Sequence, residues 1–128
     1  MRFFFEDFFG KAASKEYWKT YSSHEKRFFF AVVENKKIIG TVCLRIGYKV
    51  AGIGAFAVAA SRRKEGIGLR LLEKCEQLAK KYKCKKIWLW TLPTIPAYSF
   101  YKHNGYVEEA RLKKHFAGQD LCVMSKFL

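Results

Sequence analysis

The stretch Arg63-Lys64-Glu65-Gly66-Ile67-Gly68 decides the fold of this chain. The segment before it, Ile53 to Ala60, contains only apolar and small residues, which predicts a buried strand. After it, apolar residues recur at helical spacing: Leu69, Leu72, Cys75, Leu78 and Ala79. We therefore expect a strand, a basic glycine loop and a helix over about residues 66–83, which would be ~27 Å long at a rise of 1.5 Å per residue.

A loop of this kind can bind an anion at the start of the helix. The first N–H groups of a helix have no partner within it, and the helix dipole adds partial positive charge at the same end. Gly66 and Gly68 carry no Cβ, so a phosphate can approach the backbone closely. Taken alone, the two glycines favour an ordinary strand-to-helix turn in which they serve only tight packing. The spacings of a dinucleotide-binding turn and of a P-loop are both absent.

The segments on either side of this loop predict a sheet. Phe28 to Glu34 and Ile38 to Ile46 read as strands joined by the turn Asn35-Lys36-Lys37, and Gly47-Tyr48-Lys49 leads into the strand at Ile53. These three strands are expected to be antiparallel. Lys85 to Leu92 predicts a strand that ends at Pro93, and a right-handed crossover through the helix would place it parallel to the strand before the loop.

The last third of the chain predicts a short helix and a closing strand pair. The helix is expected over Ile95 to Asn104, with Pro96 in its first turn and Gly105 at its C-terminal cap. The strands are expected at Tyr106 to Leu112 and Leu121 to Phe127, joined by a loop over residues 114–120. In the first 27 residues, Ser14 marks an expected helix start.

A second motif lies in this short helix. The segment Pro96-Ala97-Tyr98-Ser99-Phe100-Tyr101-Lys102-His103-Asn104-Gly105-Tyr106 resembles A-x-x-[LF]-Y-x-x-x-G-[FY], and the R-x-x-G-x-G loop resembles an acyl-CoA signature. Both belong to the GNAT superfamily of N-acetyltransferases, which the chain resembles over about Phe28 to Leu128. It departs from the family pattern at Ala59-Ala60, where Asp-Pro is common, and at Thr94, where many relatives have Asn.

The resemblance implies a fold and a cosubstrate. It implies one α/β (α+β) domain over residues 1–128, with a mixed, mostly antiparallel central sheet, a parallel β-α-β crossover at the cofactor site and helices on both faces. Its N-terminal helical part, about residues 1–27, is abbreviated. The cosubstrate implied is acetyl-CoA. The residues implied to bind it are Phe56, Ala57, Val58, Arg63, Lys64, Glu65, Gly66, Ile67, Gly68, Leu69 and Thr94.

The resemblance also implies direct acyl transfer from the thioester to an amine. The strand around Val58 would supply a backbone amide to the carbonyl oxygen. Tyr101, at the position of the motif tyrosine, is the expected acid for the departing thiolate; packing under the cofactor is its alternative role. The central strands contain no glutamate, so no general base is assigned. Glu108, Glu109, His115, Asp120 and a water relay to the backbone are the candidates left open.

The charge and the cysteine content limit which partners, metal sites and disulfides we expect. The net charge of +14 is consistent with attraction of nucleic acid, with solvated helix ends, or with a field that favours a polyanionic cofactor such as coenzyme A. The charge would repel polycationic acceptors, which favours neutral or acidic ones. Cys43, Cys75 and Cys122 lie at apolar positions and are expected in the core, whereas Cys84 lies in a lysine run that predicts exposure. With no C-x-x-C pair, we expect neither a metal site nor a disulfide framework.

The sequence thus predicts a cytoplasmic N-acetyltransferase without a membrane span, since no apolar run reaches ~18 residues. Its acceptor would be a small-molecule amine, a protein N-terminus or a lysine, and a homodimer is left open. The alternative is a non-catalytic module that keeps the fold and binds acyl-CoA or nucleic acid through its basic surface. The missing strand glutamate and the lysine clusters would suit that alternative.

Overall fold

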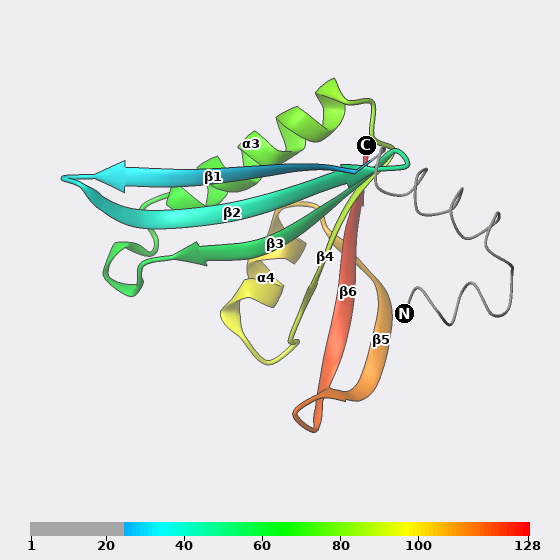
Figure 1. Cartoon of the computed structure of the whole chain (residues 1–128). Coiled ribbons are helices and arrows are strands. Elements are labelled where there is room, and N and C mark those ends of the chain that lie inside the picture. The colour runs from blue at the N-terminus through cyan, green and yellow to red at the C-terminus, as the bar shows by residue number, and fades with distance from the viewer. Residues whose placement is uncertain (1–24) are drawn as a thin grey trace, which may run out of the picture.

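Residues 25–128 are the part of the chain that the computed structural model describes, and they form one six-stranded sheet with two α-helices (Figure 1). The strand order is β1-β2-β3-β4-β6-β5. The elements are β1 (Lys26–Glu34), β2 (Lys37–Gly47), β3 (Val50–Val58), the short 3-10 helix η1 (Ala60–Arg62), α3 (Ile67–Lys81), β4 (Lys86–Thr91), α4 (Pro96–His103), β5 (Val107–Phe116) and β6 (Gln119–Phe127). The expected helix start at Ser14 lies outside the described residues.

The first three strands form an antiparallel meander, as predicted. Asn35 and Lys36 adopt left-handed φ of 50° and 63° in the first turn, and Tyr48 and Lys49 adopt 54° and 62° in the second. Two consecutive residues with positive φ give a two-residue turn whose twist matches that of the flanking strands. The third strand was placed wrongly: β3 begins at Val50 rather than Ile53 and ends at Val58.

The crossover through α3 makes β3 and β4 parallel, which confirms the predicted topology. The pairing covers only three residue pairs, from Val50 with Lys86 to Gly52 with Trp88. Beyond Gly52 the two strands diverge, with β3 following β2 while β4 continues along β6 (Figure 1). The sheet is therefore open in its middle, between the C-terminal halves of β3 and β4.

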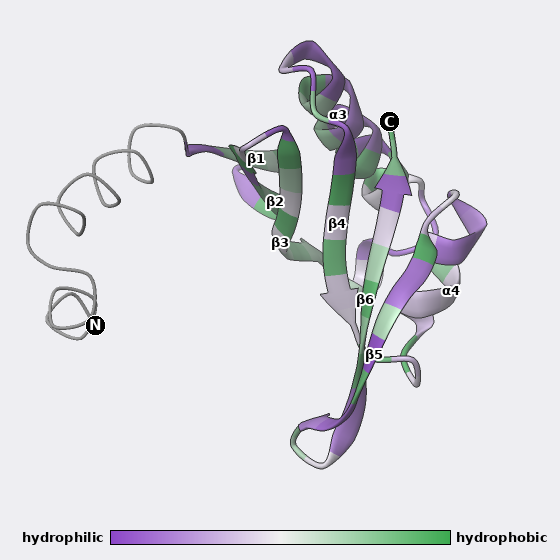
Figure 2. Ribbon diagram, turned by 90° about the vertical axis from the view of Figure 1, so that its right-hand side faces the viewer, coloured by the Kyte–Doolittle hydropathy of each residue, from purple (hydrophilic) through white to green (hydrophobic). Residues whose placement is uncertain are grey.

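Both described helices cover the same face of the sheet. The buried stripe of α3 contains Ile67, Leu71, Leu72, Cys75 and Ala79. Figure 2 shows apolar and polar residues alternating along the strands, and the apolar set of β2 and β4 lies beneath these helices. The helix expected on the opposite face falls on residues 1–27, nearly all of which lie outside the described part of the chain. The prediction that Leu69 belongs to the apolar face of the helix was wrong, because its side chain is 39% exposed.

The closing strands are longer than expected. Residues 114–120 do not form an open loop: β5 continues to Phe116, and a tight turn at Ala117 and Gly118, with φ of 48° and 78°, leads into β6. The pairing shifts register between Leu112 and Phe116, so this part of β5 is bulged. The sequence predicted a connection over residues 114–120 but not the strand residues at both of its ends.

Two further features bear on the sequence-based expectations. Cys84 is buried at 4% exposure, contrary to the prediction from its lysine-rich surroundings. It lies in the turn between α3 and β4, where its amide donates to the Ala79 carbonyl at 2.9 Å and its side chain joins the hydrophobic core. Among residues 25–128, no helix is both long and apolar enough to cross a bilayer.

Candidate functional site

The opening between β3 and β4 starts at an irregular segment of β3. The pairing of β2 with β3 shifts register after Thr41, and Ala55 adopts a left-handed φ of 47°. Thr41 Oγ1 donates a hydrogen bond to the Ala55 carbonyl oxygen at 3.0 Å, which holds the bulge in place. Bulges of this kind bend a strand and increase its twist. The bend turns β3 away from β4 and leaves backbone groups of residues 56–58 without a strand partner on the β4 side.

The basic loop lies at the end of β3, where α3 begins. Gly66 is the N-cap of α3 with a φ of 82°, and no side chain caps this end. The first N–H to bond within the helix is that of Arg70, to the Gly66 carbonyl at 3.0 Å, so the amides of residues 67–69 remain available to a ligand. A Cβ at Gly66 would meet no atom within 4 Å, and the first turn contains no acidic residue. This is an open, positively polarised helix N-terminus of the kind that binds phosphate.

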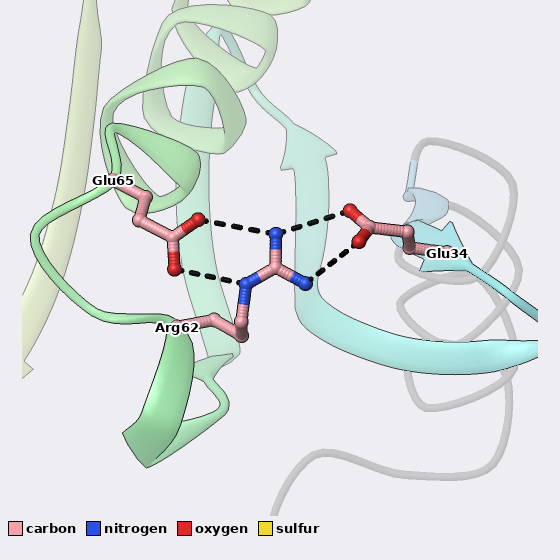
Figure 3. A network of polar contacts seen from close by, with 3 residues as sticks. All are labelled: Glu34, Arg62 and Glu65. Atoms are coloured by element: carbon pink, nitrogen blue, oxygen red, sulfur yellow. Dashed lines mark hydrogen bonds and ion pairs between the residues drawn. The ribbon is translucent and has the colours of Figure 1, made fainter.

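The shape of this loop depends on Arg62 (Figure 3). Its guanidinium donates to both carboxylate oxygens of Glu34 at 3.0 Å, and to Glu65 at 2.8 and 3.1 Å. The Arg62 guanidinium lowers the pKa of the Glu34 carboxyl. These contacts join the end of β1 to the loop. Arg62 was missed from the sequence because adjacent arginines in a basic run give no indication of which one is paired.

Among the predicted cofactor residues next to Arg62, some have charged side chains that face solvent, and others can offer a ligand only their backbone. Arg63 and Lys64 are exposed, and neither is paired with a carboxylate among residues 25–128; Arg63 Nε donates to the Val58 carbonyl at 3.3 Å. The Glu65 carboxylate is held by Arg62, so only its backbone is free for an anion. The Ile67 side chain is buried, which leaves its amide for binding.

Gly68 lies where the basic loop meets β3 and α4. A Cβ there would meet Phe56 Cε1 and Val58 Cγ2 at 3.7 Å and Phe100 Cζ at 3.8 Å, which are ordinary contact distances. Phe56 and Val58 therefore line the helix side of the opening, directly beside the helix start. The exposed Ala57 lies between them on β3.

Tyr101 lies next to this opening. Its ring packs edge-on against Phe56 with centroids 6.1 Å apart, and against Tyr106 at 5.7 Å, and the residue is 6% exposed. No hydrogen bond joins its hydroxyl to another residue of the described chain. Burial, with a smaller contribution from Cys75, raises the pKa of Tyr101 to about 12, so the phenol is protonated at neutral pH. The predicted acid is thus beside the opening.

A partly buried polar network holds the end of α4 in position. Tyr106 donates to Glu76 Oε1 at 3.1 Å, and Lys126 Nζ donates to both Glu76 oxygens at 3.2 Å and to the Asn104 carbonyl at 3.1 Å. The network connects α3, the end of α4 and β6. Because Tyr106 packs against Tyr101, these contacts also fix the position of the Tyr101 ring.

Thr94 is separate from the basic loop. Its hydroxyl donates to Gln119 Oε1 at 3.2 Å, which ties the segment between β4 and α4 to the turn of the closing hairpin. No described contact joins it to Phe56 or to the loop, and its place in cofactor binding remains a prediction.

The structure also separates the candidate bases. Glu108 accepts hydrogen bonds from Arg111 at 2.8 and 3.3 Å and from Tyr98 at 3.1 Å, and Arg111 is the main cause that lowers its pKa to about 2. Glu109 is paired with Lys86, which lowers the pKa of that carboxyl. Both are poor proton acceptors at neutral pH. Asp120 accepts from the Lys114 backbone amide at 3.1 Å within the hairpin, and His115 is exposed there.

Comparisons with known proteins agree with this fold. The model of the acetyltransferase (GNAT) family matches residues 1–106. No curated protein sequence matches the chain. Among solved structures, an acetyltransferase from Bacillus cereus ATCC 14579 is 26% identical, with 93% of this chain and 94% of that chain covered and a TM-score of 0.76.

Two more distant structures show the same fold. A PaiA N-acetyltransferase from Thermoplasma acidophilum, solved with coenzyme A, is 22% identical over 97% of this chain and 74% of that one, with a TM-score of 0.71. A Bacillus anthracis structure, assigned as a streptothricin acetyltransferase and solved with acetyl coenzyme A, is 21% identical over 80% of this chain and 62% of that one, with a TM-score of 0.73.

Proposed function

The chain belongs to the acetyltransferase (GNAT) family, and we propose that residues 1–128 act as one domain that transfers an acetyl group from acetyl-CoA to a primary amine by direct attack. Acetyl-CoA is the cosubstrate, in keeping with the fold neighbours that hold acetyl-CoA or coenzyme A. The acceptor is the amine of a small molecule, a protein N-terminus or a lysine.

One observation carries the proposal: an uncapped helix N-terminus opens beside the split between β3 and β4, with a protonated phenol packed next to the split. The amides of residues 67–69 suit the phosphates of coenzyme A, as do the cations Arg63 and Lys64, which no carboxylate of residues 25–128 pairs. Gly66 leaves the space that a diphosphate needs for close approach. The backbone of residues 56–58 has no strand partner on the β4 side. It suits the amide-containing arm of the same molecule, because backbone groups that face the split can continue the sheet's hydrogen bonding.

The residues of the chain then have separate tasks in the reaction. The neutral amine attacks the thioester carbonyl, and a backbone N–H near Val58 stabilises the resulting oxyanion. When the C–S bond breaks, Tyr101 donates its proton to the sulfur, and the proton lost by the ammonium restores the phenol through solvent. With a pKa of about 12, the Tyr101 phenol is protonated at neutral pH, so its O–H can donate to the developing thiolate.

The first test compares acetyl-CoA, coenzyme A and NAD as ligands of the full chain by thermal shift and calorimetry. We expect the first two to raise the melting temperature and NAD to leave it unchanged, because the chain lacks the dinucleotide-binding glycine spacing. Release of free thiol is then measured with a panel of primary amines. Binding without turnover of any amine would contradict the catalytic role. Tight, strongly salt-dependent duplex binding in the same protein would favour a basic module instead.

A further inference from the structure

The face of the sheet opposite the helices carries exposed aromatic residues at the same split. On β4, Leu89 and Thr91 are buried under the helices at 2% and 4% exposure, whereas Trp90 between them is 50% exposed. Side chains alternate along a strand, so Trp90 faces away from α3 and α4. It lies beyond Gly52 and Trp88, where β3 and β4 no longer pair. Trp90 therefore borders the opening from the side opposite the basic loop.

The closing hairpin brings a second aromatic ring to Trp90. Phe116 is 46% exposed, and its ring centroid is 5.7 Å from that of Trp90. β5 shifts register just before Phe116. Within this bulge Lys114 adopts a φ of 53°, and its amide donates to Asp120. The bulge bends the strand and so determines where Phe116 lies. The Thr94 to Gln119 hydrogen bond ties the hairpin turn to the segment after β4. The pair is thus held from two elements, although both rings remain accessible.

The wall of the split across from this pair is formed by small residues. Ala55 and Ala57 on β3 are exposed, and a Cβ built at Gly54 would meet no atom within 4 Å. Toward the closed end, the sheet is hollowed between Arg45, Gly52 and Trp88. Large aromatic side chains on one wall and open space along the other provide room for a flat apolar group.

The surrounding charge is unfavourable to a second cation. Lys113, Lys114 and His115 precede Phe116 in the hairpin. The nearby carboxylates already have partners: Glu108 is paired with Arg111, Glu109 with Lys86 and Glu25 with Arg27, and Asp120 accepts from the Lys114 amide. With a net charge of +14, the chain favours the neutral form of a bound amine, which is also the form that attacks a thioester.

From these observations we propose that Trp90 and Phe116 form the acceptor subsite, and that the acceptor is a small primary amine that carries an aromatic group and no second positive charge. The inference rests on the proposed function, because the basic loop places the acetyl donor on the helix side and leaves the opposite side of the split for the amine. The aromatic group stacks on the Trp90–Phe116 pair while the amine enters the split.

The test compares phenethylamine, ethylamine and spermidine as acceptors for the wild-type chain, Trp90→Ala, Phe116→Ala and the control Phe29→Ala. Phe29 is an aromatic residue of β1 with 74% exposure, away from the split. We expect wild-type kcat/KM to be highest for phenethylamine and lowest for spermidine. Trp90→Ala should reduce kcat/KM for phenethylamine by roughly tenfold, mainly through KM, and Phe116→Ala by less. The kcat/KM for ethylamine and the affinity for acetyl-CoA should be unchanged in these variants. Phe29→Ala should keep the wild-type kcat/KM for phenethylamine as well.

Equal wild-type kcat/KM for phenethylamine and ethylamine, or an unchanged phenethylamine KM in Trp90→Ala, would overturn the inference. If the wild type binds acetyl-CoA but acetylates no amine, the proposed function fails, and phenethylamine binding to the coenzyme A-saturated chain is measured by calorimetry. Binding that Trp90→Ala abolishes would retain the aromatic amine subsite. Absence of binding would overturn it as well.

Discussion

The two faces of the sheet at the split hold their aromatic residues in opposite ways. On the helix face, Tyr101 and Tyr106 are 6% and 2% exposed and pack against each other. On the opposite face, Trp90 and Phe116 also pack in pairs but are about half exposed. The covered face can set the protonation state and position of a reacting group, since burial raises the pKa of a phenol and restricts its rotamers. The open face can only contribute contact area to a ligand that arrives.

Under the proposed function, this difference gives the site a donor side and an acceptor side. The bulge at Ala55 and the short pairing of β3 with β4 create the opening that both sides share. Substitutions on the helix face should therefore change chemistry or stability, and those on the opposite face should change recognition alone.

The largest expected effect is on chemistry. Tyr101→Phe retains the ring that packs against Phe56 and Tyr106 but removes the proton donor, so kcat should fall by ~10²–10⁴-fold with little change in melting temperature. Tyr98→Phe on the same helix removes a hydrogen bond to Glu108 and serves as the control, with kcat unchanged. Because the pKa of Tyr101 is raised to about 12, the wild-type kcat should show no alkaline decline below about pH 10. Equal kcat in both variants would contradict the assignment.

The next effect is on stability, and it compares the two faces directly. Leu72 is 1% exposed in the stripe of α3, so Leu72→Ala should lower the free energy of unfolding by about 3 kcal/mol through lost burial and the cavity left behind. Phe29→Ala, on the opposite face, should change it by less than ~0.5 kcal/mol. Urea denaturation of both variants measures the difference. Similar losses would show that the two faces are equally packed.

A smaller effect is expected at the basic loop. Gly66→Ala forces a Cβ into a left-handed conformation at a φ of 82°, which should cost about 1–2 kcal/mol of stability, and it should weaken acetyl-CoA binding by steric exclusion. Gly118→Ala in the hairpin turn has a φ of 78° and equally open surroundings, so it should cost the same stability without a change in acetyl-CoA affinity. Calorimetry with acetyl-CoA separates strain from ligand contact. The phosphate-binding role would be wrong if the two variants bound acetyl-CoA equally well.

The smallest expected effect is on the pH dependence of stability. The pKa of Glu108 is lowered to about 2, mainly by its hydrogen bonds from Arg111, so the folded state favours its charged form. The stabilisation is present above the ordinary carboxyl pKa of about 4.3 and is lost as pH falls toward 2. Glu108→Gln should therefore flatten the dependence of melting temperature on pH between these limits, and it should leave kcat at pH 7.5 unchanged. A large loss of kcat would restore Glu108 as the general base.

Much of the fold follows from local patterns. The three antiparallel strands, the crossover helix, the parallel fourth strand and the short helix are predicted by apolar periodicity and turn residues, because both report on nearest neighbours in the chain. The wrong predictions concern segments whose structure depends on residues that are distant in the sequence. β3 starts at Val50 because it pairs with β2 and β4, and β5 extends through a lysine-rich segment because β6 provides hydrogen-bond partners. Cys84 is buried although lysines surround it in sequence.

The sequence alone determined the loop with its two glycines, the motif tyrosine in a second segment, and the family these indicate, because each depends on residue types at short spacing. Only the tertiary structure decided which charges remain free, since Arg62 is neutralised by Glu34 from a strand that is distant in sequence, whereas Arg63 and Lys64 are not paired with any described carboxylate. It also decided that Glu108 and Glu109 are held by cations, and that Trp90 and Phe116 meet at the open face. These features arise where the chain returns to itself across strands, and pairing between distant strands leaves no local pattern by which it can be foreseen.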